Sequence, residues 1–145
     1  MTRVDFYVLP DDREEADQTR LRVACRLCEK AVAAGSRVHV HAPEAEVADE
    51  FDRLLWIYKQ GGFIAHERMT GTPASPLPAV LIGAGAPPES HRDVLINLGA
   101  AAPAFFDQFQ RVLEVVGAGP AERNRSRARF KFYRDHSCTP ETHKL

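Results

Sequence analysis

Ser90, His91 and Asp93 carry the side chains of a hydrolytic triad: a nucleophilic hydroxyl, a general base and a carboxylate that orients the base. Residues so close in sequence do not normally reach the mutual geometry of a triad, and no nucleophile elbow surrounds the serine. The remaining acids are scattered and offer no pair suited to acid–base catalysis. We therefore expect a protein without a catalytic site.

Two further pairs have side chains that bind metals. His39 and His41 alternate along a predicted strand and point to one side of it, but no third ligand is indicated, so we expect both to face solvent. Cys25 and Cys28 form a C-x-x-C motif within a helical pattern, without a second Cys or His pair at zinc spacing. We expect the two thiols to pack on a core face of that helix, and we expect no metal or other cofactor.

Loops that hold phosphates are also missing from the sequence. No G-x-x-x-x-G-K-[ST] motif occurs, and Gly83-Ala84-Gly85 runs into Pro87-Pro88 instead of the start of a helix. This glycine pair is interpreted as a turn between strands.

Composition sets the class of protein. The 145 residues include 19 Lys and Arg against 20 Asp and Glu, with 44% hydrophobic residues and three cysteines, which is typical of one domain, 1–145, with reduced thiols. No apolar run approaches the roughly 18 residues of a membrane span. We expect a cytoplasmic protein with no membrane partner.

The elements that must position any site follow from hydrophobic periodicity. Apolar patterns predict strands at 3–9, 38–41, 63–66, 79–82 and 93–98, and helices at 21–35, 47–58 and 121–135. Residues 105–116 fit either a helical face or, in RVLEVV, a buried strand. This alternation of strands and helices indicates an α/β fold.

The predicted C-terminal helix is strongly basic. Residues 123–134 (RNRSRARFKFYR) hold six cations and no acid, whereas the residues before 123 hold 12 bases and 18 acids. On a helical wheel one sector contains Arg123, Arg127, Phe130, Lys131 and Arg134. This sector could be a solvated surface, a nucleic-acid site or a pocket for an acidic peptide with a hydrophobic tip. The acidic body favours the peptide over nucleic acid.

Aromatic residues mark a second segment, 54–66 (LLWIYKQGGFIAH). Trp56 lies beside the predicted core positions Leu55 and Tyr58 and could itself belong to the core. If Trp56 is instead exposed beside Phe63, the pair predicts a protein-binding hot spot, because large rigid aromatics dominate interface energies.

Taken together and in order, these segments resemble the chi subunit family of bacterial DNA polymerase III. The resemblance rests on VDFYVLP, FDRLLWIYKQGGFIAH, HRDVLINL, RVLEVV and RARFKFYR, which span nearly the whole chain. It implies a three-layer α/β/α sandwich with a mixed central sheet, Rossmann-like without a phosphate-binding loop, in which RVLEVV is a strand. It also implies an adaptor subunit without catalysis of its own.

The resemblance assigns two surfaces to partners. The acidic C-terminal tail of single-stranded-DNA-binding protein would bind Val116, Arg123, Arg127, Phe130 and Lys131, with Tyr133 and Arg134 close by. The psi subunit, or a helicase in its place, would bind Trp56, Phe63, Ala65 and His66. Phe130 stands where tyrosine is familiar, and Ala65 stands where proline is more usual. DNA would be contacted mainly indirectly; the alternative is direct binding of single-stranded nucleic acid by the basic helix.

Overall fold

The computed structural model describes residues 2–10, 16–57, 64–69 and 77–145. In chain order its helices and strands are β1 (Arg3–Val8), α1 (Ala16–Ala33), β2 (Val38–His41), α2 (Ala45–Ile57), β3 (His66–Arg68), β4 (Val80–Gly83), η1 (Glu89–His91), β5 (Val94–Asn97), η2 (Phe106–Gln108), β6 (Arg111–Val116), α3 (Pro120–Asp135) and β7 (Glu141–Lys144), where η1 and η2 are short 3₁₀ helices. None of the described helices is long and apolar enough to cross a membrane.

The described strands form one seven-stranded sheet in the order β3-β4-β2-β5-β6-β1-β7. The expected α/β/α sandwich is confirmed, but the sheet is not mixed, because every described strand pair is parallel. β2, β4 and β5 are buried along their whole length. Such continuous burial is typical of parallel strands that are covered on both faces.

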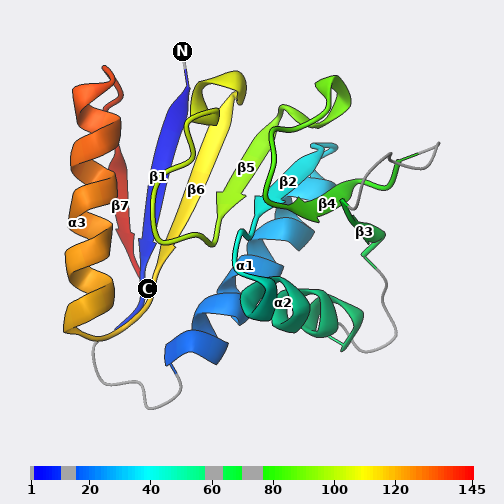
Figure 1. Ribbon diagram of the computed structural model, residues 1–145, viewed down its shortest axis with the longest axis horizontal. Helices are drawn as coiled ribbons and strands as arrows, with labels where there is room; N and C mark the ends of the chain where they lie inside the picture. Colours follow the sequence, from blue (N-terminus) through cyan, green and yellow to red (C-terminus); the bar gives the residue numbers. More distant parts are fainter. Residues whose placement is uncertain (1, 11–15, 58–63, 70–76) are drawn as a thin grey trace.

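Helices cover the two faces of the sheet unequally (Figure 1). α1 and α2 pack on one face through an apolar stripe, and their buried residues include Ala24, Cys25, Cys28, Phe51 and Leu54. α3 lies on the opposite face. There η2 and its neighbours complete the layer, and the buried residues of this second core include Val4, Phe6, Phe106, Val112 and Tyr133.

Most predicted elements occur close to their expected positions. In the ambiguous stretch, Phe106–Gln108 forms η2 and Arg111–Val116 forms β6, so the strand that the resemblance implied is confirmed. The strand expected at 63–66 begins only at His66 and continues to Arg68. Tyr58 and Phe63 lie outside the described residues.

β7 is a strand that periodicity did not predict. Its sequence, ETHK, is polar, and most of the strand is exposed. Pairing with β1 holds it in place: His143 stacks on Tyr7 with ring centroids 4.9 Å apart, and its Nε2 lies 2.9 Å from Asp5 Oδ1. These contacts join the beginning of the chain to its end.

Candidate functional site

The predicted basic sector is the side of α3 that overhangs β1, and we call it the basic flank: Arg123, Arg127, Phe130, Lys131 and Arg134. The half-buried Phe130 ring packs on Phe6 of β1, with ring centroids 5.3 Å apart. Nearer the start of α3, Arg123 Nη2 donates a 2.8 Å hydrogen bond to the carbonyl oxygen of Leu9, just after β1. One face of α3 therefore combines an apolar contact with β1 and a row of cations.

The helix start gives this flank a concave end. Gly119 adopts a φ of 107°, a conformation that favours glycine, and Pro120 follows at the first turn of the helix. Gly119, Pro120, Arg123, Asn124 and Arg127 line a pocket there. The pocket lies where β1 and β6 end, so it opens at the carboxyl edge of the sheet.

The other cations of the flank are exposed. Arg127 Nη1 donates to Asn124 Oδ1 at 3.2 Å, and Lys131 pairs with Asp135 at 2.9 Å across one helical turn. Arg134 is also exposed. Such solvated contacts are weak, so these side chains can exchange them for an acidic ligand at small cost.

Two of the predicted tail-site residues lie deeper than the sequence suggested. Val116 is buried in the core at the end of β6. Tyr133 has no exposed surface, and its hydroxyl donates a hydrogen bond to Glu114 Oε2 inside the protein. The structure therefore brings Arg123, Arg127, Phe130, Lys131 and Arg134 together at the surface, but it places Tyr133 in the core beneath them.

A buried ionic network anchors α3 to the sheet, and sequence reasoning missed it. Glu114 on β6 accepts hydrogen bonds from Arg129 Nε at 2.9 Å, from Asn97 Nδ2 at 2.8 Å and from the Tyr133 hydroxyl. Arg129 is 2% exposed and also contacts Glu122 at 3.3 Å. Burial raises the pKa of the Glu114 carboxyl, against the opposing effect of the Arg129 charge. The only available signal was an acid inside the apolar run RVLEVV.

The second predicted surface lies at the end of α2. Trp56 and Ile57 are 56% and 59% exposed, so Trp56 belongs to the surface and not to the core. His66 packs edge-on against Trp56, with ring centroids 4.8 Å apart, while its own side chain is 1% exposed and its Nε2 lies 2.9 Å from Asp52 Oδ1. Ala65 is exposed, and Phe63 is outside the described residues. Sequence reasoning named Trp56 but missed Ile57.

The structure does not arrange Ser90, His91 and Asp93 as a catalytic triad. His91 Nε2 lies 2.6 Å from the Pro78 carbonyl oxygen and its Nδ1 lies 2.7 Å from Ser90 Oγ. Asp93 instead accepts the backbone N–H of Arg37 at 2.8 Å. The carboxylate therefore does not orient the histidine, and no triad is assembled from these residues.

The histidines on β2 correct one expectation. His39 is fully buried and His41 is 8% exposed, because loop and η2 residues cover this face of the sheet: Phe105 packs edge-on against both rings. Burial lowers the pKa of His39 to about 4 and also lowers that of His41. Neither histidine faces solvent, contrary to the prediction.

The cysteine prediction fits the structure. Cys25 and Cys28 are free thiols with no exposed surface in the α1 core. Burial raises the pKa of Cys25 to about 12, and it raises that of Cys28 as well. Both are therefore packed thiols of low reactivity.

Within the described residues, Asp5, Glu141 and His143 are the one group spaced closely enough to share a metal ion. Asp5 already pairs with Arg3 at 3.1 Å and with Arg111 at 2.9 Å. These cations occupy the carboxylate, so the group is an ion-pair cluster that joins β1, β6 and β7.

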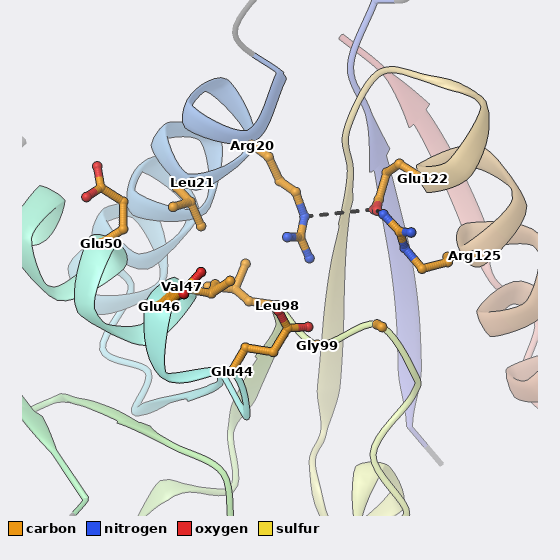
Figure 2. Close-up of a pocket in the computed structure, with 11 residues that line it drawn as sticks. Arg20, Leu21, Glu44, Glu46, Val47, Glu50, Leu98, Gly99, Glu122 and Arg125 are labelled. Carbon is orange, nitrogen blue, oxygen red and sulfur yellow. Dashed lines mark hydrogen bonds and ion pairs between the residues drawn. The ribbon is translucent and has the colours of Figure 1, made fainter.

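A pocket at the carboxyl edge of the sheet lies where parallel α/β folds commonly bind ligands (Figure 2). Figure 2 shows Arg20 of α1 pointing toward Glu122 of α3, and the two side chains are 3.9 Å apart. Glu44, Glu46 and Glu50 from the α2 side also line the pocket. The acids outnumber the arginines, so this lining disfavours a polyphosphate.

Comparisons with known proteins support one family. Residues 1–141 match the family model of the DNA polymerase III chi subunit, HolC. The chain is also 42% identical over 145 residues to the DNA polymerase III subunit chi of Pseudomonas aeruginosa, covering 100% of this chain and 98% of that protein.

A solved structure shares the fold. The crystal structure of T4 UvsW superimposes with a TM-score of 0.65 at 8% identity, over 99% of this chain, which spans 42% of the length of the UvsW chain. This likeness concerns the fold alone, whereas the family match and the 42% identity cover essentially the whole sequence. The chain belongs to the DNA polymerase III chi subunit family.

Proposed function

We propose that this chain is a non-catalytic adaptor subunit of the bacterial replicative DNA polymerase III holoenzyme. In this role it links the clamp loader, through the psi subunit, to the acidic C-terminal tail of single-stranded-DNA-binding protein. The observation that carries the proposal is the basic flank of α3, in which exposed cations surround an aromatic ring seated on β1.

The chemistry of the flank suits an acidic peptide with an apolar tip. Arg123, Arg127 and Lys131 offer donors for carboxylates, and the edge of Phe130 offers an apolar contact for a terminal side chain. Because position 130 is phenylalanine, recognition there uses no hydroxyl. Tyr133 supports this surface from within, through Glu114, and does not touch the peptide.

The expected affinity is moderate. Hydrogen bonds to charged groups contribute about 1.5–3 kcal/mol each, and ordering a flexible tail and long arginine side chains offsets part of that gain. Many tails displayed on coated DNA raise the effective concentration of the ligand. An adaptor of this kind is retained at the DNA while individual contacts still exchange.

Calorimetric titration tests the tail site. A short peptide of several aspartates ending in phenylalanine should bind the wild-type chain saturably, and binding should weaken as salt is added. Arg127→Ala should lower the affinity about tenfold or more. Arg26→Ala, on an exposed part of α1, is the matched control and should bind as the wild type does. An Arg127→Ala variant of wild-type affinity would argue against this site.

A second ligand separates peptide binding from nucleic-acid binding. An oligonucleotide that binds when the peptide does not would assign the same cations to phosphates. The peptide model further requires the terminal phenylalanine, so its replacement by serine should abolish measurable binding. Retention of full affinity by that serine peptide would contradict an apolar contact at Phe130.

For the psi subunit we propose the surface around Trp56 and Ile57. Both side chains are more than half exposed. An exposed aromatic side chain as large as Trp56 is typical of protein interfaces. His66 supports the Trp56 ring from below and is itself too buried for a large contact. A helicase that binds in place of psi would use the same exposed pair.

Trp56→Ala tests this second surface. We expect it to weaken binding of a psi subunit at least tenfold, measured by calorimetry, while the affinity for the acidic peptide is unchanged. The matched control is Arg127→Ala, for which the opposite pattern is expected. Loss of both ligands in either variant would mean that the two surfaces are not independent.

A further inference from the structure

β7 pairs with β1, the strand that the basic flank contacts, and its side chains alternate between the two faces of the sheet. Asp5 and Tyr7 contact His143, so positions 5, 7, 141 and 143 share the face that points away from α3. In the same register Phe6 is opposite Thr142 and Val8 is opposite Lys144. Thr142 and Lys144 therefore lie on the face that carries α3.

α3 does not cover this part of the sheet. The helix is centred over β6, where Arg129 and Tyr133 reach Glu114, and its basic flank extends over β1. Thr142 and Lys144 are both exposed, and Val8 is half-buried. The end of β1 around Val8 therefore forms a strip of surface between α3 and β7, which we call the β1 strip; Figure 1 shows β7 and β1 beside α3.

Lys144 lies level with the N-terminal end of the flank, which holds Arg123 and Arg127. α3 runs from the carboxyl edge of the sheet toward the amino edge, because Arg123 bonds to Leu9 while Phe130 packs on Phe6. Val8, opposite Lys144, is two residues beyond Phe6, a distance of about 6.7 Å along the strand. At about 1.5 Å per residue along the helix, this places Lys144 across from the turn that contains Arg127.

Lys144 is also free to accept a new acidic partner. It forms no ion pair with any other residue that the structure describes, whereas Lys131 on the flank is paired with Asp135. Cations on both sides of the β1 strip favour an extended acidic chain between them over a ligand that lies on the helix alone.

We propose that Lys144 is a specificity-determining residue of the tail site, which contacts the acidic residues of the peptide from the β7 side of the β1 strip. The inference rests on the proposed function, since it assumes that the basic flank binds an acidic tail. The apolar tip lies beside Phe130, and the preceding carboxylates extend along the β1 strip between Arg127 and Lys144.

Charge reversal tests the proposal on the full chain. Lys144→Ala should lower the affinity for the aspartate–phenylalanine peptide about two- to fivefold, and Lys144→Glu should lower it more, as expected for an exposed charge contact. The difference from the wild type should shrink at high salt. Lys30→Glu on α1 makes the same change of net charge away from the β1 strip and should bind as the wild type does.

A second peptide shows whether Lys144 acts on the acids themselves. When the aspartates distant from the phenylalanine are replaced by asparagine, wild type and Lys144→Glu should bind with equal affinity. If Lys144→Glu binds the acidic peptide as tightly as the wild type while Arg127→Ala loses it, the role of Lys144 is refuted and the tail site stands. If the wild-type chain does not bind the acidic peptide at all, the tail site and the role of Lys144 both fail.

Discussion

Replacement of Arg129 by methionine should lower the free energy of unfolding far more than replacement of an exposed arginine of α3. The side chain is 2% exposed and makes three contacts, with Glu114 at 2.9 Å, the Ala100 carbonyl oxygen at 3.1 Å and Glu122 at 3.3 Å. Without it, the buried Glu114 carboxylate keeps only neutral donors. Removing one member of a buried ion pair costs about 3–5 kcal/mol, a large part of the roughly 5–15 kcal/mol that stabilises a typical domain.

Urea unfolding followed by circular dichroism measures this loss. Arg127→Met, two residues away and exposed, is the matched control and should change the free energy of unfolding by no more than about 0.5 kcal/mol. The double variant Glu114→Leu/Arg129→Met should be less destabilised than the sum of its single variants, since it leaves no charge unpaired in the core.

The pH dependence gives an independent check of the same reasoning. In Arg129→Met the pKa of Glu114 should rise further, because burial remains and the nearest positive charge is gone. A carboxyl whose pKa is higher in the folded than in the unfolded chain favours folding as the pH falls. The stability gap to the wild type should therefore be smaller at pH 5 than at pH 7. A gap below about 1 kcal/mol at pH 7 would refute the assigned role of Arg129.

Three further predictions concern other parts of the molecule. Burial alone would raise the pKa of Asp5, but hydrogen bonds from His143 and Arg111 hold this pKa below its usual value. The Asp5 carboxylate should therefore stabilise the fold above about pH 4 and lose that effect on further acidification. In unfolding experiments between about pH 2 and 5, Asp5→Asn should lack this part of the pH dependence of stability. Phe51→Ala should cost about 3–5 kcal/mol in urea unfolding, because the ring is fully buried between α2 and the sheet. Trp56→Ala should cost less than about half of that, since more than half of the side chain is already exposed, and a larger loss in the same assay would show that Trp56 belongs to the core.

Local pattern was sufficient for most of the elements and for the basic flank. The helical wheel placed Arg123, Arg127 and Phe130 on one side of α3, and the structure has them there, because the angle between residues depends only on helix geometry. The alternation of His39 and His41 correctly put them on the same face of β2. It could not show that this face is covered, since Phe105 comes from a segment far away in the sequence.

Two missed features, the buried Arg129 and the strand β7, depend on partners that are distant in the chain. Nothing within residues 123–134 distinguishes Arg129 from the exposed arginines, and only Glu114 on β6 gives it a buried partner. β7 has neither length nor hydrophobicity and forms because β1 presents a free edge with Asp5 and Tyr7. Such long-range pairings leave no local periodicity from which they could be predicted.

The position of β1 between β6 and β7 has a consequence for how the protein is made. Both neighbours of β1 come from the last third of the sequence, and the Asp5–His143 contact spans 138 residues. Because β1 is synthesised before β6 and β7, both of its edges stay unpaired until β6 has left the ribosome. Folding of this half of the sheet is therefore a late event of high contact order. A nascent chain stopped before α3 would therefore have no basic flank.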